Sequence, residues 1–338
     1  MNHWVLGYRL LAVIGVALLW LPTTVFATDV DEARQALAKQ EDDEDSTQQL
    51  EEVFRATERR YTLIRQGHHS LNYSFDYAFS SDQRLDLEIQ DDSIRNADVA
   101  PEATHNFTNT FNYDYGLLNN LTLGIRVPLV TKFDTEENLS VYDVGDLAIT
   151  TRWQPRPHRP GRASLTLFST LTSKTGVSPF EIDVDRQLST GSGYYSVSLG
   201  VSLSRVLDPV VLFGSFSGTH NFKEAGLNQV RGGRVLEQVE PGIGVSGSGG
   251  FAYSLSYDIS LSLSAQFSYN DETQLNFRDG SSARARDQMA GIVNFSLGTR
   301  VSDNTIVNTS VGFGLTHAAP DFSVGISLPI NISGLSGS

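Results

Sequence analysis

The sequence predicts a transmembrane antiparallel up-and-down β-barrel, and three observations support this prediction. An export signal comes first, and strands of alternating polarity follow it. Short and long connections between these strands mostly alternate along the chain. Between residues 121 and 130, large aliphatic residues alternate with mostly small or polar ones, and the same period of two recurs in 259–268 and 322–331. Because the second face is mostly Ser, Gly, Thr and Asn, the apolar faces are expected to meet lipid. The alternative is a secreted all-β protein.

Residues 1–27 have the features of a cleavable export signal. A basic residue, Arg9, precedes the apolar run 10–21, and Val25-Phe26-Ala27 meets the small-residue rule of signal peptidase. No later apolar run approaches the roughly 20 residues that a membrane-spanning helix needs. If the mature chain is a membrane protein, strands are therefore expected to cross the membrane.

Residues 28–66 are predicted to form a separate periplasmic region. The acidic run at 41–45 indicates a solvated linker. Ser46 and Gln49 are spaced to cap a helix that follows the linker. The apolar face of that helix includes Leu50, Phe54, Tyr61 and Ile64. With about two heptads, the helix is too short for an independent coiled coil. It is expected to rest on the barrel rim, to plug or gate the lumen, or to mediate oligomerisation.

Residues 67–338 are predicted to form the barrel, with twelve strands. We expect these strands near residues 68–80, 104–115, 120–133, 143–155, 162–174, 190–206, 210–222, 240–253, 258–270, 286–301, 305–316 and 321–332. The longer connections lie at 81–103, 134–142, 175–189, 223–239 and 271–285, and the last one, 317–320, is short. Bacterial outer-membrane barrels have short periplasmic turns and long outer loops. The alternation therefore predicts that both termini are periplasmic.

Parity within the strands separates an outer from an inner face. The aromatic residues that share the apolar parity on the first two strands are Tyr73, Phe75, Tyr77, Phe79, Phe107, Phe111, Tyr113 and Tyr115. A charged side chain that faces lipid near the middle of the membrane costs about 2–4 kcal/mol, so polar residues of the other parity are assigned to the lumen. The predicted pore-lining residues are Asp76, Asn112, Asp114, Arg126, Arg152, Gln266, Asn294, Arg300 and Asn308. They are expected to form a charged constriction or to fill a narrow barrel as paired ladders.

Composition excludes several kinds of site. The 338 residues include no cysteine, which excludes disulfides, thiolate metal sites and a cysteine nucleophile. The formal net charge of −14 argues against a nucleic-acid partner. Acidic clusters at 91–92 and 181–185 offer the oxygen ligands that calcium prefers, but they lack the spacing and glycine of an EF-hand loop. A solvated surface is the favoured interpretation, and no metal or cofactor is expected.

A hydrolase is the enzymatic alternative. A serine nucleophile needs a histidine within hydrogen-bond reach and a third group that orients it. The histidines expected near the outer rim are His105, His220 and His317. Ser217 and Asn221 are the candidate partners of His220, and no recognisable motif encloses them. We therefore predict a protein without catalytic activity.

Short stretches with Gly and Pro carry a resemblance to known proteins. These stretches are Val141–Trp153, which contains Gly145-Asp146 before an apolar strand, and 173–176, 188–194, 207–213 and 241–244. Together they resemble the MetA-pathway of phenol degradation family, which implies an outer-membrane transporter over about residues 70–330. The same stretches, behind a periplasmic helix, are similar to the exporter of Fap functional amyloid. This chain lacks that exporter's long coiled coil, and it ends without the terminal Phe or Trp of many outer-membrane proteins.

The sequence thus predicts a passive channel or transporter in the outer membrane of a diderm, Gram-negative bacterium. Its substrate would be a small solute or an export substrate. The alternatives are an exporter of functional-amyloid subunits and, less favoured, an outer-membrane hydrolase. The expected partners are outer-membrane lipid and lipopolysaccharide, the barrel-assembly machinery and the transported substrate. A homo-oligomer is left open.

Overall fold

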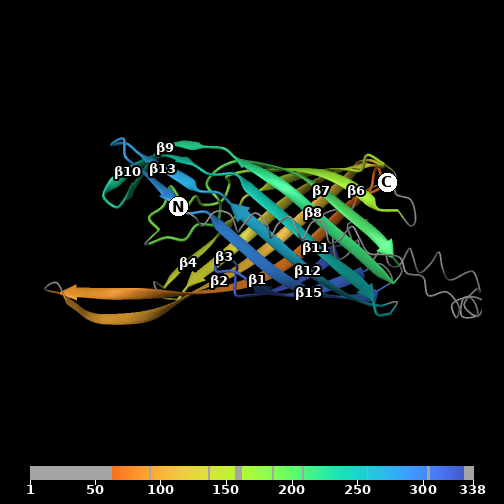
Figure 1. The fold of residues 1–338 in the computed structure, drawn as a ribbon. Helices are drawn as coiled ribbons and strands as arrows, with labels where there is room; N and C mark the ends of the chain where they lie inside the picture. The colour runs from red at the N-terminus through yellow and green to blue at the C-terminus, as the bar shows by residue number, and fades with distance from the viewer. Residues whose placement is uncertain are drawn as a thin grey trace, which may run out of the picture. The chain divides into compact units, whose positions relative to one another are not determined.

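The protein is a closed antiparallel barrel of twelve strands, as the sequence predicts (Figure 1). The computed structural model describes residues 63–90, 93–135, 138–156, 162–184, 186–207, 209–256, 258–302 and 305–330. The strands follow the order β2-β1-β17-β16-β15-β12-β11-β8-β7-β6-β5-β3, and the pairing of β2 with β3 closes the ring. The predicted signal peptide at 1–27 and the helix residues Leu50, Phe54 and Tyr61 lie outside the described residues.

The described residues form seventeen strands. The barrel strands are β1 (His69–Gln90), β2 (Ser93–Leu118), β3 (Leu121–Asp134), β5 (Ala148–Trp153), β6 (Ser164–Thr172), β7 (Ser196–Leu207), β8 (Val210–Asn221), β11 (Gly244–Ser254), β12 (Ile259–Asn270), β15 (Gln288–Ser302), β16 (Thr305–Gly314) and β17 (Phe322–Ile330). The remaining strands are β4 (Leu139–Val144), β9 (Glu224–Arg231), β10 (Arg234–Glu240), β13 (Thr273–Phe277) and β14 (Ser282–Ala285).

The predicted strand at 143–155 is interrupted. The predicted range holds β5 and the last two residues of β4, which both pair with β3, and residues 145–147 between them are not part of a strand. Gly145 lies at the break, where its amide donates a hydrogen bond to the carbonyl of Pro128, 2.8 Å away. Since Pro128 has no N–H to donate in return, the ladder cannot be completed regularly at this position.

Four of the predicted outer loops contain strand residues, and in one of them, 134–142, β4 begins at Leu139. Past Ser81, β1 and β2 continue as a hairpin that reaches Gln90 and Ser93, beyond the residues at which β17 and β3 stop pairing with them. The loops at 223–239 and 271–285 contribute β9, β10, β13 and β14 to a separate four-stranded sheet. Hydrogen bonds between loops therefore extend the regular structure past the barrel end that we call the long-loop end. The other end, with connections such as 119–120, is the short-turn end.

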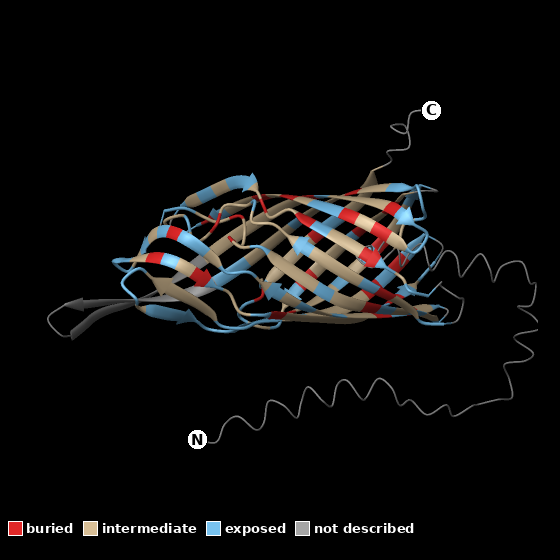
Figure 2. Ribbon diagram, turned by 90° about the horizontal axis from the view of Figure 1, so that it is seen from above, coloured by how far each residue is buried: buried red, intermediate tan, exposed pale blue. Residues whose placement is uncertain are grey.

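Alternation along the strands gives the barrel an apolar outside and a polar inside. Leu199, Phe216 and Phe295 are 63%, 58% and 46% exposed on the outer face. Positions of the other parity include Thr122, Ser202 and Ser260, which are 0%, 3% and 3% exposed. Buried residues are spread along several strands in Figure 2 and form no single apolar layer. Within the described ranges, no helix is long and apolar enough to cross a membrane.

Candidate functional site

All nine residues predicted to line a pore have the inward parity. In β3, for example, Arg126 has the parity of the fully buried Thr122, whereas the exposed Ile125 has the opposite parity. Cross-strand pairing places Asn112 opposite Arg126 on the same face, and Asn308 opposite Ser327. These residues do not form one cluster. The five that line cavities in the lumen are Asn112, Asp114, Arg126, Arg152 and Gln266.

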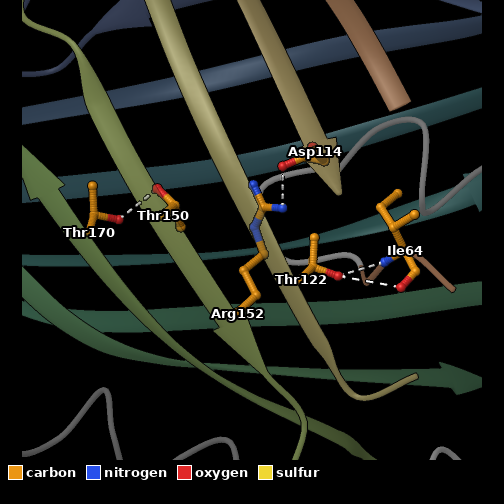
Figure 3. A network of polar contacts seen from close by, with 6 residues as sticks. All are labelled: Ile64, Asp114, Thr122, Thr150, Arg152 and Thr170. Atoms are coloured by element: carbon orange, nitrogen blue, oxygen red, sulfur yellow. Dashed lines mark hydrogen bonds and ion pairs between the residues drawn. The ribbon is translucent and has the colours of Figure 1, made fainter. Parts of the chain in front are cut away.

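A buried ion pair stands near the short-turn end of the lumen. Arg152 on β5 donates to the Asp114 carboxylate on β2 across 2.8 Å, and the two side chains are 10% and 15% exposed (Figure 3). The hydroxyl groups of Thr150 on β5 and Thr170 on the neighbouring strand β6 are in contact at 3.0 Å. A buried pair is costly to break because one charge is then left without compensation. Polar side chains thus pair with one another in this part of the barrel.

The chain enters the barrel at the same end. The backbone amide of Ile64 donates to the hydroxyl of Thr122 over 2.8 Å, and Gly67 donates to the carbonyl of Gly116 over 2.8 Å (Figure 3). A Cβ on Gly116 would clash with the carbonyl oxygens of Ile64 and Arg65. Because Thr122 faces inward, Ile64 lies against the inner wall of the barrel. Of the residues predicted for the plug-or-gate helix, Ile64 is the one that the structure describes, and it is not part of a helix there.

Two adjoining cavities hollow the lumen. The upper cavity, toward the long-loop end, measures about 510 Å³ and is lined by Thr108, Thr110, Arg126, Pro128, Val130, Lys132, Gly145, Asp146, Thr172, Thr190, Gly191, Ser192, Tyr194, Ser196 and Asn221. The lower cavity measures about 390 Å³, and its lining includes Asp114, Arg152, Gln266 and many hydroxyl side chains. Both are lined by Arg126 and Thr172, which therefore lie at their junction.

The β6–β7 loop, residues 173–195, forms part of the upper cavity and is held there by Asp146. The Asp146 carboxylate accepts hydrogen bonds from the amides of Gly176 and Ser192, at 3.0 and 2.6 Å, and from the Ser192 hydroxyl at 2.7 Å. Hydrogen bonds to an ionised carboxylate are stronger than those between neutral groups. Asp146 lies in the break between β4 and β5, so the interruption of that strand creates the anchor of the loop.

Further contacts hold the loop against the barrel wall. The Thr190 hydroxyl donates to the carbonyl of Val144 over 2.9 Å, and the Lys132 ammonium donates to the carbonyl of Ser189 over 2.6 Å. The backbones of Gly176 and Gly191 meet so closely that a Cβ on Gly176 would lie 2.7 Å from the Gly191 Cα. Small residues are needed here because two backbones approach each other directly.

The four-stranded sheet holds the loop from the other side. Lys174 donates to Glu224 at the start of β9 over 2.7 Å, and this hydrogen bond raises the pKa of Lys174. The Arg231 guanidinium donates to the carbonyls of Pro179 and Ile182. Phe180 packs against the buried cluster of that sheet, which consists of Leu227, Leu236 and Val239. The loop is thus fixed at both of its surfaces.

Sequence reasoning missed Asp146, Lys132 and Thr190. Asp146 carries no period-two signal, because it lies between two strands. A signal was nevertheless present: the short stretches with Gly145-Asp146, Gly176 and Gly191 all meet at this one place. The Asp146 carboxylate also acts on Tyr194 in the loop. Burial is the larger cause that raises the pKa of Tyr194, and the negative charge of Asp146 is the second cause.

The candidate hydrolase site is not formed. Ser217 lines the lower cavity, whereas His220 has the opposite parity on β8 and its ring packs on Phe222, 5.1 Å away. The Ser217 hydroxyl and the His220 ring therefore lie on opposite faces of the strand and cannot form a hydrogen bond. His105 contacts the Tyr77 hydroxyl at 2.9 Å on the outer face. The suggestion of a Ser217–His220 pair was wrong because it used closeness in sequence without strand parity.

Comparison with known proteins supports the fold. No family model matches the sequence. The crystal structure of the COG4313 outer membrane channel from Pseudomonas putida F1 is similar, with a TM-score of 0.62 and 13% identity over 80% of this chain and 97% of that one. Weaker matches are the transport unit of the autotransporter AIDA-I from Escherichia coli (TM-score 0.44, 12% identity, 83% and 95% covered) and the KdgM porin in complex with disordered oligogalacturonate (TM-score 0.41, 9% identity, 78% and 99% covered). At 13% identity, the likeness to the COG4313 channel concerns the barrel fold alone.

Proposed function

We propose that this protein is a passive outer-membrane channel for small solutes. The observation that supports the proposal is the hollow, polar lumen, with adjoining cavities of about 510 and 390 Å³ behind a strongly apolar outer face. A barrel that served only as a scaffold would gain nothing from open polar space, because unfilled volume sacrifices packing contacts. Water-filled lumens lined by polar residues are typical of porins.

The arrangement of the barrel ends supports an orientation. Short connections lie at the end where β1 begins and β17 finishes, and outer-membrane barrels keep such turns in the periplasm. We propose that both described ends of the barrel chain lie on the periplasmic side. Lipid and lipopolysaccharide would then contact the apolar outer face, and the barrel-assembly machinery would insert the strands. The four-stranded sheet and the β1–β2 hairpin would face the exterior.

The size of the lumen favours small solutes over the export of amyloid subunits. An unfolded polypeptide could pass only if the β6–β7 loop left the lumen, and this loop is held by Asp146, Lys132 and Lys174. The resemblance to the MetA-pathway family agrees with solute transport. We therefore place the chain with such transporters as part of this proposal.

Planar lipid bilayers test the proposal directly. The purified mature protein should produce discrete conductance steps, and the same preparation denatured by heat should produce none. Heat-dependent migration in gels verifies beforehand that the barrel is folded. The His220→Ala variant should conduct like the wild type, because His220 lies outside the lumen. Absence of conductance from correctly folded protein would overturn the proposal.

A further inference from the structure

One amide side chain on the outer face of the barrel lies at the depth of the membrane centre. Thr108 and Thr110 line the upper cavity, so Asn109 between them on β2 points outward. β1 pairs with both β17 and β2 over residues 71–79, and Phe75, the middle residue of this stretch, lies opposite Asn109. A strand needs about 9–11 residues to cross a membrane. Asn109 therefore lies about halfway across.

A polar side chain in this position is exceptional. Among the outward positions of the described barrel strands, Asn109 is the one amide or charged side chain that lies away from the strand ends. The Tyr73 hydroxyl donates to its Oδ1 over 2.6 Å, and the described residues supply no other hydrogen-bond partner to this side chain. Hydrocarbon offers neither donors nor acceptors, so an amide that faces it is costly. The two N–H groups of Asn109 therefore favour a polar partner from outside the chain.

Aromatic rings surround this amide on the outer face. The Tyr73 ring packs on Phe111 with centroids 5.3 Å apart, and Tyr77 packs on Phe107 at 4.9 Å. Phe107 also meets Phe133 edge to face at 6.0 Å. Aromatic residues of outer-membrane barrels concentrate at the two membrane interfaces, whereas these rings continue through the middle. Aromatic residues are also enriched where proteins contact each other. The outer face of β1, β2 and β3 thus has the composition of a protein interface.

A second copy of the chain supplies the partner that this amide lacks. Copies in one membrane have the same orientation, so a two-fold axis between them runs along the membrane normal. Each residue near this axis then meets its own counterpart at the same depth. The Oδ1 of Asn109 has a second lone pair beside the one that Tyr73 uses, and the amide nitrogen has two donors. Two such amides can therefore donate to each other.

We propose that the protein forms a two-fold symmetric dimer in the membrane through the outer face of β1, β2 and β3, with the two Asn109 amides paired at the axis. The aromatic rings around the amides exclude lipid from the pair. Each barrel is closed by its own strands, so the dimer does not depend on whether the lumen conducts.

Sedimentation equilibrium in density-matched detergent measures this association. The wild type should exchange between monomer and dimer. Asn109→Leu should raise the dissociation constant by about ten-fold, because each dimer loses its reciprocal hydrogen bonds. Thr309→Leu is the matched control and should leave the dissociation constant unchanged, because Thr309 is an exposed polar residue with the outward parity on β16. Each variant must show the heat-dependent gel migration of the folded barrel, and leucine at either position suits a lipid-facing surface.

Counting of subunits in vesicles tests the dimer in a bilayer. The chain has no cysteine, so Ser282→Cys on the exposed strand β14 provides a single site for a fluorescent label. Spots of the labelled protein should bleach in two steps, and those of the same protein with Asn109→Leu mostly in one. Single steps at every protein density, or equal dimer content in the Asn109→Leu and Thr309→Leu proteins, would overturn the inference. A chain that stays monomeric alone and uses Asn109 to bind a different outer-membrane protein would also overturn it.

Discussion

At the scale of single residues, Asp146 does the most to shape the lumen. It lies in a break of the barrel wall, and its two carboxylate oxygens bind amides and a hydroxyl of the β6–β7 loop. Gly191 must lack a side chain, because a Cβ there would clash with the Asp146 carboxylate. By contrast, a Cβ on Gly218, on the outer face of β8, would meet no atom within 4 Å. The need for glycine at position 191 thus comes both from the loop anchor and from the close approach of the Gly176 backbone.

Replacement of Asp146 by Asn should loosen the β6–β7 loop. The amide nitrogen of Asn cannot accept the hydrogen bonds that one carboxylate oxygen accepts now, and a lost charge-assisted bond costs about 2 kcal/mol. The open population of the loop should rise by roughly 30-fold. Tryptic cleavage after Lys174 in detergent measures this opening. Asp183→Asn is the matched control, because the Asp183 carboxylate lies in the same loop and its pair with Arg186, at 3.8 Å, is exposed. Equal cleavage of both variants would contradict the anchoring role.

At the scale of elements, the seam between the first and last strands depends on a loop carboxylate. β1 pairs with β17 from Leu71 to Phe79, and just beyond this ladder the amide and hydroxyl of Ser81 donate to Asp321 at 2.8 and 2.5 Å. These hydrogen bonds lower the pKa of Asp321 below its ordinary value of 3.8. The seam therefore has a reinforcing contact at its long-loop end.

The contact between Ser81 and Asp321 should make the seam sensitive to acid. Because the folded protein lowers the Asp321 pKa, its ionised form stabilises the fold above pH 3.8, and this contribution is lost as the pH falls through the lowered pKa. Ser81→Ala should lower the thermal midpoint at neutral pH, and the difference from wild type should vanish in strong acid. Thermal unfolding followed by circular dichroism at several pH values measures it. A difference that persists unchanged below the pKa would count against this linkage.

At the scale of the whole molecule, a closed ring of strands satisfies the backbone and leaves the lumen free for other segments. Each barrel strand has a neighbour on both sides, so no open edge remains in the ring that the structure describes. The β6–β7 loop uses this space at one end, and the segment at Ile64 enters it at the other. Neither contributes a strand to the ring.

Deletion of residues 28–66 should raise the single-channel conductance and still permit insertion. The strands determine the fold, and if the deleted region plugs the lumen, as one interpretation of its sequence predicts, its removal widens the short-turn mouth, where Ile64 contacts the inward-facing Thr122. Thr122→Val, which removes the hydroxyl that accepts from Ile64, should increase conductance to a smaller extent. Single-channel recordings of the three proteins measure both effects. Equal conductance of truncated and complete protein would mean that the N-terminal region lies outside the pore.

The sequence by itself determined the barrel and the faces of its strands. A period of two is a local property, so Leu123, Ile125 and Arg126 could be assigned to the outside or the lumen from their immediate neighbours alone. The even strand number and the alternating connections followed from the same pattern. The nine inward residues have the predicted parity for this reason.

Only the tertiary structure decided how the lumen is divided. Asp146 contacts Ser192 across 46 positions of the chain, and Lys132 contacts Ser189 across 57. A period of two within a strand does not predict such contacts, because they depend on where the ring brings β3, the β4–β5 break and the β6–β7 loop together. The same holds for Ser217 and His220, which are close in sequence and separated by the strand itself. Alternation fixes the side of the wall for each residue, and closure of the ring fixes which residues face each other across the lumen.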